Sequence, residues 1–416
     1  MILKLTEQKL YTKIFIFFVI FFFIFGMKTP VGSLAQIFTV FICFFGFFIY
    51  RNYFFKPSKA FLFLILFLIY DFIVCAVWAV FFGTYDFNIL TTKTNFILSV
   101  FATYILGVFF FRNYEKKDFF VLLSLVFLVQ SLIIIAMLLN PGFSDFIMTY
   151  TKDSNVTERM LNNYSGARGL GLADSAAFGF SVVMAIFLLL SLFSYKKGYI
   201  SGKYFFILIF LGIVASISAG RVSLLGAILG SLFLILNYNK PKIFMLTTSL
   251  FFGSLFLFLF LISLRNTNIE PQALATLYNY SMEPIFNYID YGELKSSSTD
   301  ALLQRMYFPL NEKQLLIGDA RYVEGDKYYM STDAGYMRFS LFYGAINSMV
   351  LYLSYLLFSL FVFLRLKDLD EKILIVLMVL LSFFLHYKGE IILFAVSYNK
   401  LLLLVVFFLY MKSLKN

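Results

Sequence analysis

Hydrophobic residues occur along this 416-residue chain in long runs, which are separated by short polar segments. A helix needs about 20 consecutive apolar residues to cross the hydrocarbon core of a bilayer. On that basis we expect twelve membrane spans, at residues 11–27, 34–50, 60–82, 94–111, 119–139, 173–194, 204–219, 222–238, 243–264, 339–364, 373–387 and 391–411. The seventh, eighth and eleventh spans are short, so the expected number holds to within one or two. An even number places both ends of the chain on one side of the membrane.

The polar segments between the spans form two alternating sets that differ in charge. The segments of one set are short and carry two or three cations each: Lys4, Lys9 and Lys13; Arg51, Lys56 and Lys59; Arg112, Lys116 and Lys117; Lys196, Lys197 and Lys203; Lys240 and Lys242; Arg365, Lys367 and Lys372; Lys412 and Lys415. The other set contains the short turns near Lys28 and Lys93 and two long segments, 140–172 and 265–338. Because cytoplasmic loops are enriched in Lys and Arg, we expect both termini in the cytoplasm and both long segments outside.

The segment 265–338 is a hydrophilic insert rich in Tyr, Ser, Asn and charged residues. Its stretches 272–284 and 301–307 have the apolar spacing of short amphipathic helices. We therefore expect it to form a small cap that folds onto the membrane surface.

The composition agrees with this pattern and excludes several classes of protein. Hydrophobic residues make up 61% of the chain and charged residues 14%, which is far outside the range of soluble domains. The chain is therefore expected to be a single all-α integral membrane domain. Cys43 and Cys75 lie within apolar spans, so no disulfide framework is expected. The net charge of +11 comes from Lys dispersed over many loops, which does not favour nucleic acid as a partner. No small-residue cleavage site follows the first apolar run, so that span is expected to stay in the membrane.

The arginines are distributed against the usual bias toward the cytoplasm. Three arginines lie in the predicted cytoplasmic loops: Arg51, Arg112 and Arg365. Seven lie on the predicted outer side: Arg159, Arg168, Arg221, Arg265, Arg305, Arg321 and Arg338. Outer loops are normally poor in positive charge, so this excess predicts that an anionic ligand binds at the outer face.

Two of these arginines lie in turns of small residues at span ends. Arg168 belongs to segment 166–175 (GARGLGLADS), where glycines allow close approach of a ligand and Asp174 or Ser175 would cap the following helix. An arginine beside a helix N-terminus favours anion binding. Arg221 belongs to segment 216–223 (SISAGRVS), which has too few polar residues for a true loop, so we expect it at or just below the outer surface. The alternative is a snorkelling arginine in each turn.

A third polar element ends the long outer segment. Residues 318–321 (GDAR) and 331–338 (STDAGYMR) place Asp333, Tyr336 and Arg338 at or near the start of the next span. If that helix begins near Thr332, Asp333 and Tyr336 lie on one face. A carboxylate near arginines at a dry boundary can act as a base or as a charge partner. The alternative is a helix N-cap with an Arg–Asp pair.

A fourth polar element contains His386, Lys388 and Glu390 between the last two spans. His386 is the only histidine of the chain, which excludes a histidine-based metal site and gives no support to a Ser-His-Asp triad. Lys388 and Glu390 are expected to pair with each other or with charges of the outer loops. A lone histidine at a helix end is often incidental.

With these elements the chain resembles the O-antigen polymerase and ligase superfamily of bacterial inner membranes, and in particular the Wzy-type oligosaccharide repeat-unit polymerases. The resemblance covers roughly residues 160–400 and lies in the order of five short elements: Arg168 with Gly171; Ser218, Gly220 and Arg221; Asp333, Gly335 and Tyr336; Gly344; and Lys388 with Glu390. It implies a GT-C-like membrane glycosyltransferase at the periplasmic face. Its implied donor and acceptor are glycans linked to undecaprenyl diphosphate, with undecaprenyl diphosphate as the leaving group and no metal or cofactor.

The resemblance also implies roles for individual residues. Arg168 and Arg221 would clamp the diphosphate, because guanidinium groups bind phosphate oxygens in a bidentate way. Asp333 would orient or deprotonate the acceptor hydroxyl; the ligase branch has a histidine at the comparable position, which favours a polymerase. The expected substrate-binding residues are Arg305, Arg321, Arg338, Tyr336, Lys388 and Glu390. A chain-length regulator is a possible partner. Tyr322, Tyr328 and Tyr329 would stack on sugars or belong to the interfacial aromatic belt.

Other classes of function remain open at this point. A flippase or other transporter predicts charged residues around a central cavity and two related halves. Asp71 and Lys400 are the main charges deep inside the expected spans, but the two halves of the chain differ and one loop dominates. An O-antigen ligase and a polymerase of the teichoic acid or peptidoglycan type are closer enzyme alternatives. A purely structural membrane protein would not need an outer cluster of arginines.

Overall fold

The computed structural model describes residues 10–152, 158, 166–175, 178–235, 262–263, 265, 267, 269–325 and 327–415. The expected span 243–264 lies outside the described residues except for 262 and 263, and Arg159 also lies outside them. The helices of the first half are α1 (Leu10–Phe25), α2 (Leu34–Ile49), α3 (Arg51–Phe55), α4 (Lys59–Phe81), α5 (Asn88–Asn113), α6 (Lys116–Leu139), α7 (Pro141–Thr151) and α9 (Phe178–Lys196). Those of the second half are α10 (Gly202–Ala219), α11 (Leu224–Ile235), α13 (Gln272–Tyr291), α14 (Ser297–Ala301), α15 (Glu312–Leu316), α16 (Gly335–Arg365), α17 (Leu369–His386) and α18 (Val396–Lys415).

Several shorter elements connect these helices. Arg221–Ser223 and Tyr329–Ser331 form 3-10 turns, and Leu302–Met306 forms a π-helical turn. Two antiparallel hairpins are present, β1 (Lys28–Thr29) with β2 (Gly32–Ser33), and β3 (Val323–Glu324) with β4 (Lys327–Tyr328).

Seven of the described helices are long and apolar enough to cross a membrane: α4, α5, α6, α9, α10, α16 and α18. Three further apolar helices are shorter: Leu10–Phe25, Leu34–Ile49 and Arg221–Ile235. The chain is therefore an all-α, multi-pass membrane protein, as its composition predicted. The expected number of twelve spans stays a prediction.

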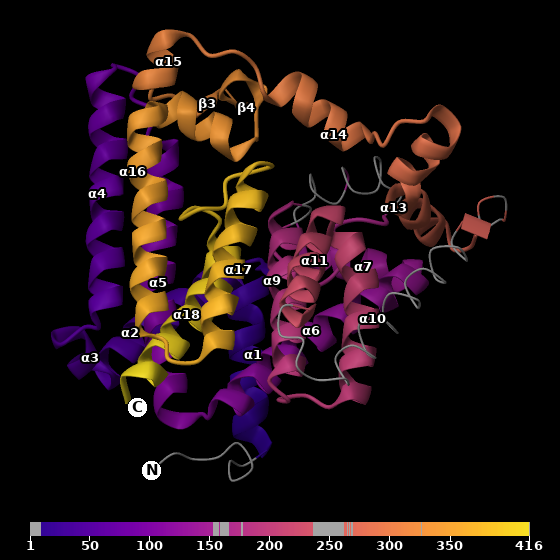
Figure 1. Cartoon of the computed structure of the whole chain (residues 1–416), viewed down its shortest axis with the longest axis horizontal. Coiled ribbons are helices and arrows are strands. Elements are labelled where there is room, and N and C mark those ends of the chain that lie inside the picture. The colour runs from indigo at the N-terminus through magenta and orange to yellow at the C-terminus, as the bar shows by residue number, and fades with distance from the viewer. Residues whose placement is uncertain are drawn as a thin grey trace.

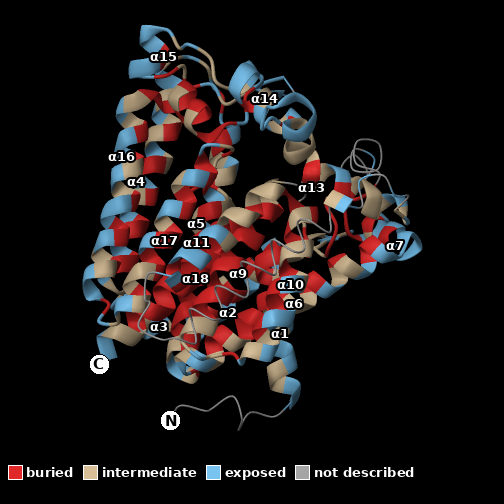
Figure 2. Ribbon diagram, turned by 45° about the vertical axis from the view of Figure 1, so that its right-hand side comes forward, coloured by how far each residue is buried: buried red, intermediate tan, exposed pale blue. Residues whose placement is uncertain are grey.

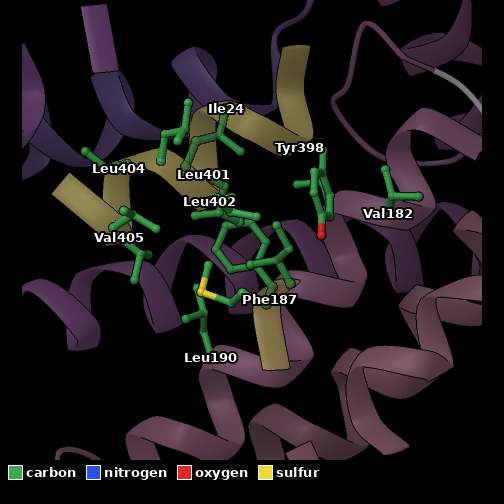
Figure 3. Close-up of a cluster of buried hydrophobic side chains, with 14 of the residues drawn as sticks. Ile24, Val182, Phe187, Leu190, Tyr398, Leu401, Leu402, Leu404 and Val405 are labelled. Atoms are coloured by element: carbon green, nitrogen blue, oxygen red, sulfur yellow. The ribbon is translucent and has the colours of Figure 1, made fainter. Parts of the chain in front are cut away.

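Helices α9 and α18 form the centre of the helical bundle. Inside the protein, 83% of the apolar window of α9 and 78% of that of α18 are buried, against 33% for the peripheral α16. Leu190 and Phe187 of α9 pack near Leu401, Leu402 and Val405 of α18 (Figure 3). Exposed apolar residues cover the outer faces of the peripheral helices α4 and α16 (Figure 2), where a bilayer would solvate them.

Close packing in the bundle depends on small residues. A Cβ atom at Gly226 of α11 would overlap the backbone carbonyl of Ala185 of α9, so only glycine allows these two helices to approach so closely. Such contacts replace the hydrophobic effect as the cause of helix association, because lipid tails are as apolar as the side chains.

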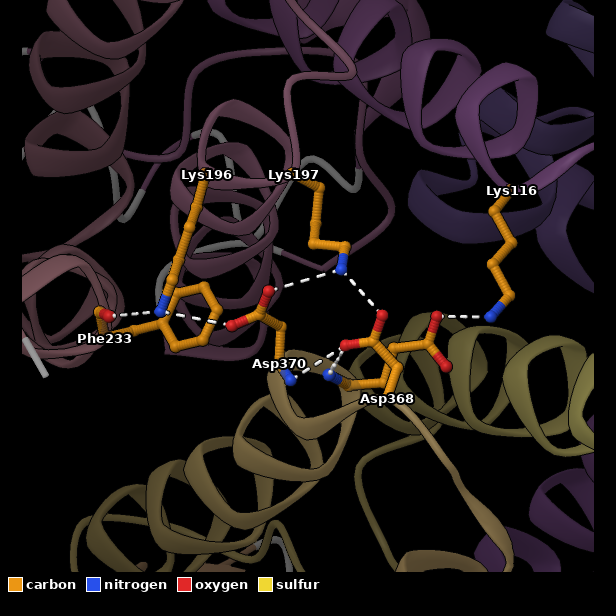
Figure 4. A network of polar contacts seen from close by, with 7 residues as sticks. Lys116, Lys196, Lys197, Phe233, Asp368 and Asp370 are labelled. Carbon is orange, nitrogen blue, oxygen red and sulfur yellow. Dashed lines mark hydrogen bonds and ion pairs between the residues drawn. The ribbon is translucent and has the colours of Figure 1, made fainter. Parts of the chain in front are cut away.

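One end of the bundle is joined by lysine–carboxylate pairs (Figure 4). Lys197 lies 2.7 Å from Asp368 and 3.2 Å from Asp370, and Lys196 lies 3.3 Å from Asp370. Lys116 pairs with Glu371 of α17. These contacts bring together three of the lysine-rich loops that the sequence predicted on the same side of the membrane, and the C-terminus lies at this end too (Figure 1).

The opposite end carries the cap, which we define as residues 269–331. It includes α13, α14, the π-helical turn, α15 and the β3–β4 hairpin, so helical structure occurs at both stretches where the sequence predicted it. The cap is anchored to the helices below it: the Trp78 indole N–H donates to Ile317 O at 3.0 Å, and Thr84 Oγ1 donates to Ala320 O at 2.7 Å. Asp86 accepts hydrogen bonds from the backbone N–H groups of Tyr322 and Val323.

A left-handed glycine allows α16 to accommodate the cap. Gly344 has φ +70°, which interrupts the helical backbone, and a Cβ atom at this position would overlap the backbone of Leu316 and Ile317. The interruption therefore gives the segment after α15 its close contact with α16.

The structure corrects the expected position of Lys93. The sequence placed it in an outer turn before a span at 94–111, but α5 begins at Asn88 and Lys93 is buried within it. Its ammonium forms an ion pair with Asp71 of α4 at 2.7 Å, and Tyr343 of α16 donates a hydrogen bond to the same carboxylate at 2.9 Å. Hydropathy placed the start of the span too late because it treats the lysine as an isolated charge, whereas in the helix Asp71 neutralises it.

Candidate functional site

Four polar elements that are far apart in the sequence meet beneath the cap. A Cβ atom at Gly335, at the start of α16, would overlap the carbonyl oxygens of His386 and Gly389, and one at Gly389 would overlap the Phe178 ring. Ser218 of α10 donates a hydrogen bond to the carbonyl of Ala167 at 2.8 Å. These contacts gather segments 166–175, 216–223, 331–335 and 386–390 at one end of the bundle.

Arg168 and Arg221 converge on one aromatic ring. The guanidinium carbon of Arg168 lies 4.8 Å from the centre of the Tyr280 ring, and that of Arg221 lies 4.2 Å from it. Tyr280 belongs to α13 of the cap. Cation–π contact positions a guanidinium group without neutralising its charge, so the Tyr280 ring holds both arginines close together at full charge.

The turn after α10 positions Arg221. Gly220 ends the helix with φ +157° and ψ +141°, and the Ser223 hydroxyl donates to the carbonyls of Ser216 and Gly220, both at 2.8 Å. Nη2 of Arg221 lies 2.9 Å from Glu283 and 3.2 Å from the Ser298 hydroxyl, while Nη1 is buried and has no hydrogen-bond partner among the described residues. The cap residues Glu283 and Ser298 therefore bind Nη2 of Arg221, whereas the hydrogen-bonding capacity of Nη1 is not used by the described residues.

Glu283 is held in its charged form. Partial burial raises its pKa, but hydrogen bonds from Ser297 and the charge of Arg221 outweigh burial, so the pKa lies below its ordinary value. A carboxylate of α13 thus contacts Arg221 directly.

Lys388 adds a third cation to the same region. Burial lowers its pKa, and repulsion from Arg221 and Arg168 lowers it further, while Asp333 opposes the shift. We call Arg168, Arg221 and Lys388 the cationic centre. Mutually repelling cations beneath a cap form a site with affinity for a multiply charged anion.

Arg338 and Glu390 form a separate, closed pair. Nη1 of Arg338 lies 3.0 Å from Oε2 of Glu390, and the two side chains are only 4% and 8% exposed. The Tyr322 hydroxyl donates to the same carboxylate oxygen at 3.0 Å, and the Arg338 guanidinium carbon lies 3.9 Å from the Tyr322 ring centre and 3.6 Å from that of Tyr328. Burial raises the pKa of Glu390, and the charge of Arg338 opposes the increase.

This pair changes the interpretation of several predicted residues. Glu390 pairs with a residue of the outer segment, which was one of the two expected alternatives. The guanidinium group of Arg338 contacts the rings of Tyr322 and Tyr328, and these contacts attach the cap to α16. The three side chains are therefore engaged in contacts within the protein. Tyr322 is not a solvent-facing sugar platform, because its ring lies against Arg338 and its hydroxyl is bonded to Glu390.

Asp333 and Tyr336 do not share a helix face as expected. The helix α16 begins at Gly335 with Ala334 as the N-cap. The Thr332 hydroxyl accepts from the Ala334 N–H at 3.3 Å and donates to the carbonyl of Met306 at 2.9 Å, so Thr332 lies before the helix. Asp333 is exposed and precedes the helix, near Lys388. The Tyr336 hydroxyl donates to the carbonyl of Phe383 in α17 at 3.0 Å, and its ring packs against His386.

The two remaining predicted arginines lie on the surface of the cap. Arg305 is exposed in the π-helical turn, and Arg321 is exposed with its guanidinium carbon 5.5 Å from the Tyr329 ring centre. In the described part of the chain, neither arginine contacts Arg168 or Arg221. They are candidates only for contacts with a substrate that is long enough to reach the exposed surface of the cap.

Sequence reasoning did not identify Tyr280, Glu283 and Ser298 as partners of the two arginines. The only available signal was the amphipathic spacing of 272–284, which indicates a helix but not what it covers. Across the described ranges no group of three or more His, Cys, Asp or Glu could hold a metal ion.

Comparison of the chain with protein-family models, with curated proteins and with solved structures found no match. The fold and the site together define a multi-pass membrane protein whose cap covers a cluster of three cations.

Proposed function

We propose that this protein is a polysaccharide polymerase that joins oligosaccharide repeat units linked to undecaprenyl diphosphate at the periplasmic face of a bacterial inner membrane. The observation that carries the proposal is the convergence of Arg168, Arg221 and Lys388 beneath the cap. A diphosphate that leaves from a sugar gains negative charge in the transition state, and guanidinium groups fixed in a partly buried site stabilise it most effectively.

In the proposed reaction, a hydroxyl at the non-reducing end of the acceptor attacks the anomeric carbon of the donor. The new glycosidic C–O bond forms while the bond between the anomeric carbon and the phosphate oxygen breaks. Its electron pair goes to undecaprenyl diphosphate, which Arg168, Arg221 and Lys388 would bind. The hydroxyl proton goes to Asp333, which is exposed and lies near Lys388.

This proposal assigns Arg338 and Glu390 a different role from the one the resemblance implies. Their buried pair would hold α16 and the cap in register, so that Asp333 and Lys388 keep their positions at the cationic centre. They would act as positioning residues and not as ligands of the diphosphate.

The test is the glycan profile of a strain that lacks this chain and is complemented with variants. Arg168→Ala and Arg221→Ala are expected to leave the protein inserted and to abolish long glycan chains, so that the surface carries single repeat units. Arg365→Ala is the matched control, because this arginine is exposed at the end of α16 opposite the cap. Normal chain length in both variants would contradict the diphosphate clamp.

The profile also separates the alternative functions. Polymer that remains on the lipid carrier in the strain lacking the chain would identify a ligase, and lipid-linked units that accumulate in the cytoplasm would identify a flippase. With purified protein, turnover is expected to persist in EDTA. Loss of turnover that added Mg²⁺ restores would contradict metal-independent transfer.

A further inference from the structure

A second polar cavity lies away from the cationic centre, between α2, α5 and the start of α18. Its volume is about 180 Å³, and Ser33, Thr39, Asn95, Ser99, Asp174 and Lys400 contribute polar groups to its walls. None of these residues has a described contact with Arg168, Arg221 or Lys388. The proposed glycosyl transfer does not use this cavity.

Lys400 gives the cavity a buried positive charge. It is 3% exposed, and its ammonium donates to the carbonyls of Phe23 and Ala35 at 3.2 Å each and to the Thr39 hydroxyl at 2.9 Å. All three acceptors are neutral, and no carboxylate of the described residues lies within ion-pair distance of the ammonium. These three hydrogen bonds use all three protons of the ammonium, and Asp174 is a carboxylate that interacts with it electrostatically from the same cavity. An anion at the cavity would therefore be attracted by the charge of Lys400 and not by a free hydrogen-bond donor.

Asp174 supplies a complementary acceptor. One of its carboxylate oxygens accepts a hydrogen bond from the Ser33 hydroxyl, and the other, Oδ1, is buried with no hydrogen-bond partner among the described residues. Lys152, which is 7% exposed, lies close by and donates to the carbonyl of Ala173 at 3.5 Å. Two buried cations therefore surround one carboxylate, and the region as a whole is positive. An anion that also carries a hydroxyl group would satisfy both Lys400 and Asp174.

An apolar groove continues directly from this cavity. Its volume is about 440 Å³, and it shares Val40 and Leu98 with the polar cavity. Most of its other lining residues are phenylalanines, including Phe44, Phe48 and Phe101. From Val40 to Phe48 the groove follows α2 for about 12 Å, which is close to half of the roughly 30 Å hydrocarbon core.

The polar cavity and the apolar groove together match the shape of an amphiphilic molecule, which has a polar end and an apolar chain. The polar end lies near the outer side of the bundle, where α18 begins, and the apolar end extends toward α3. Their combined size lies within the range of about 300–1,000 Å³ that is usual for ligand sites. A free phosphate ion would fill only the polar end and leave the phenylalanine groove unexplained.

We propose that this cavity and groove form a site for an anionic phospholipid of the outer leaflet whose headgroup bears hydroxyl groups, as in phosphatidylglycerol. The phosphate lies near Lys400, a headgroup hydroxyl donates to Oδ1 of Asp174, and one acyl chain occupies the phenylalanine groove. Because Asp174 and Arg168 belong to the same segment, 166–175, the lipid also supports the backbone that carries Arg168.

Native mass spectrometry of the purified chain from nanodiscs tests the proposal. The nanodiscs contain equal amounts of phosphatidylglycerol and phosphatidylcholine, and the lipid that stays bound after detergent exchange is counted. Lys400→Met is expected to reduce retained phosphatidylglycerol about tenfold, because the attraction between the buried ammonium charge and the phosphate is lost. Lys412→Met is the matched control: it lies at the other end of the same helix and donates to the carbonyl of Phe111 at 2.9 Å.

A second variant keeps the proposal testable if Lys400→Met does not fold. Val40→Trp fills the junction of the cavity and the groove from the lipid side and leaves Lys400 and Asp174 intact, and it is expected to reduce retention to a similar extent. Unchanged retention in Val40→Trp, or equal retention of the two lipids by the unmodified protein, would overturn the proposal. Selective loss of phosphatidylglycerol in Val40→Trp and Lys400→Met, with none in Lys412→Met, would support it.

Discussion

The two arginine regions beneath the cap differ in how their charge is balanced. Arg338 is paired with Glu390, donates to a backbone carbonyl and lies against two tyrosine rings. Arg168 and Arg221 share one tyrosine ring, and Arg221 contacts a carboxylate that is a quarter exposed. Lys388 adds a further positive charge to the second region but not to the first.

This difference separates a structural arginine from one that is available to a ligand. A buried arginine whose hydrogen-bonding edge is filled by a carboxylate has no capacity left for a phosphate, whatever its position in the sequence. The cationic centre keeps excess charge, and part of the Arg221 edge is unsatisfied. The comparison therefore predicts that substitutions at the two regions affect different properties: stability for Arg338 and Glu390, and activity for the cationic centre.

The largest effect on stability is expected at the closed pair. Glu390→Leu leaves the Arg338 guanidinium group buried without a counter-ion, which we expect to cost about 3–5 kcal/mol of unfolding free energy. Thermal unfolding in detergent measures the change. The double variant Arg338→Met/Glu390→Leu removes both charges and should recover most of the loss. An unchanged melting temperature in Glu390→Leu would contradict the structural role of the pair.

The next largest effect is expected for Arg221→Ala, and it should concern activity. Removal of one preorganised donor to the leaving diphosphate should reduce turnover roughly 100-fold. The melting temperature should change little, because a partly exposed ion pair such as Arg221–Glu283 contributes only about 0–1 kcal/mol. The turnover of Arg221→Lys should lie between that of Arg221→Ala and that of the unmodified protein, since an ammonium group lacks the bidentate fork. Equal losses of stability in Arg221→Ala and Glu390→Leu would remove the distinction between the regions.

A smaller effect is expected at the tyrosine ring that the two arginines share. Tyr280→Ala removes both cation–π contacts, each of which contributes about 0.5–1 kcal/mol at a site of this kind. We expect the KM for the lipid-linked donor to rise several-fold while kcat changes less. Tyr280→Phe keeps the ring and should behave as the unmodified protein. A kcat reduced as much as in Arg221→Ala would instead place Tyr280 among the groups that contact the reacting atoms.

The smallest effect is a pH dependence of stability at Glu283. Its pKa in the folded protein lies below the ordinary value of 4.5. The charged carboxylate therefore stabilises the fold above pH about 4.5, and this contribution is lost as the pH falls through the lower folded pKa. Glu283→Gln should flatten this part of the curve of melting temperature against pH. Identical curves for the variant and the unmodified protein would show that the ion pair with Arg221 does not contribute.

Much of the helical framework could be predicted from the sequence, whereas helix ends and charge partners could not. The apolar runs near 34–50 and 60–82 correspond to α2 and α4 within about a residue at each end. The start of α5 was misplaced because Lys93 resembles a loop residue until its partner Asp71, on another helix, is known. The helix after segment 166–175 was expected to begin at residue 173, but α9 begins at Phe178.

The candidate site shows the same division. The sequence predicted that Arg168 and Arg221 face the outer side, because the alternation of spans determines the side on which each turn lies. It did not reveal that Tyr280 and Glu283 contact them, since α13 is separated from both arginines by long stretches of chain. Only the family resemblance ranked Arg221 above Arg338, because by position alone both are arginines in predicted outer segments.

By itself, the sequence determined the membrane class, the approximate position of most helices and the excess of arginine in the predicted outer segments. These properties depend on the transfer of each residue between water and lipid, which is local and can be summed along the chain. Only the tertiary structure decided which charges are neutralised. Coulomb energy depends on the distance between groups in space, and folding brings Arg338 to Glu390, Lys93 to Asp71, and Arg168, Arg221 and Lys388 to one another.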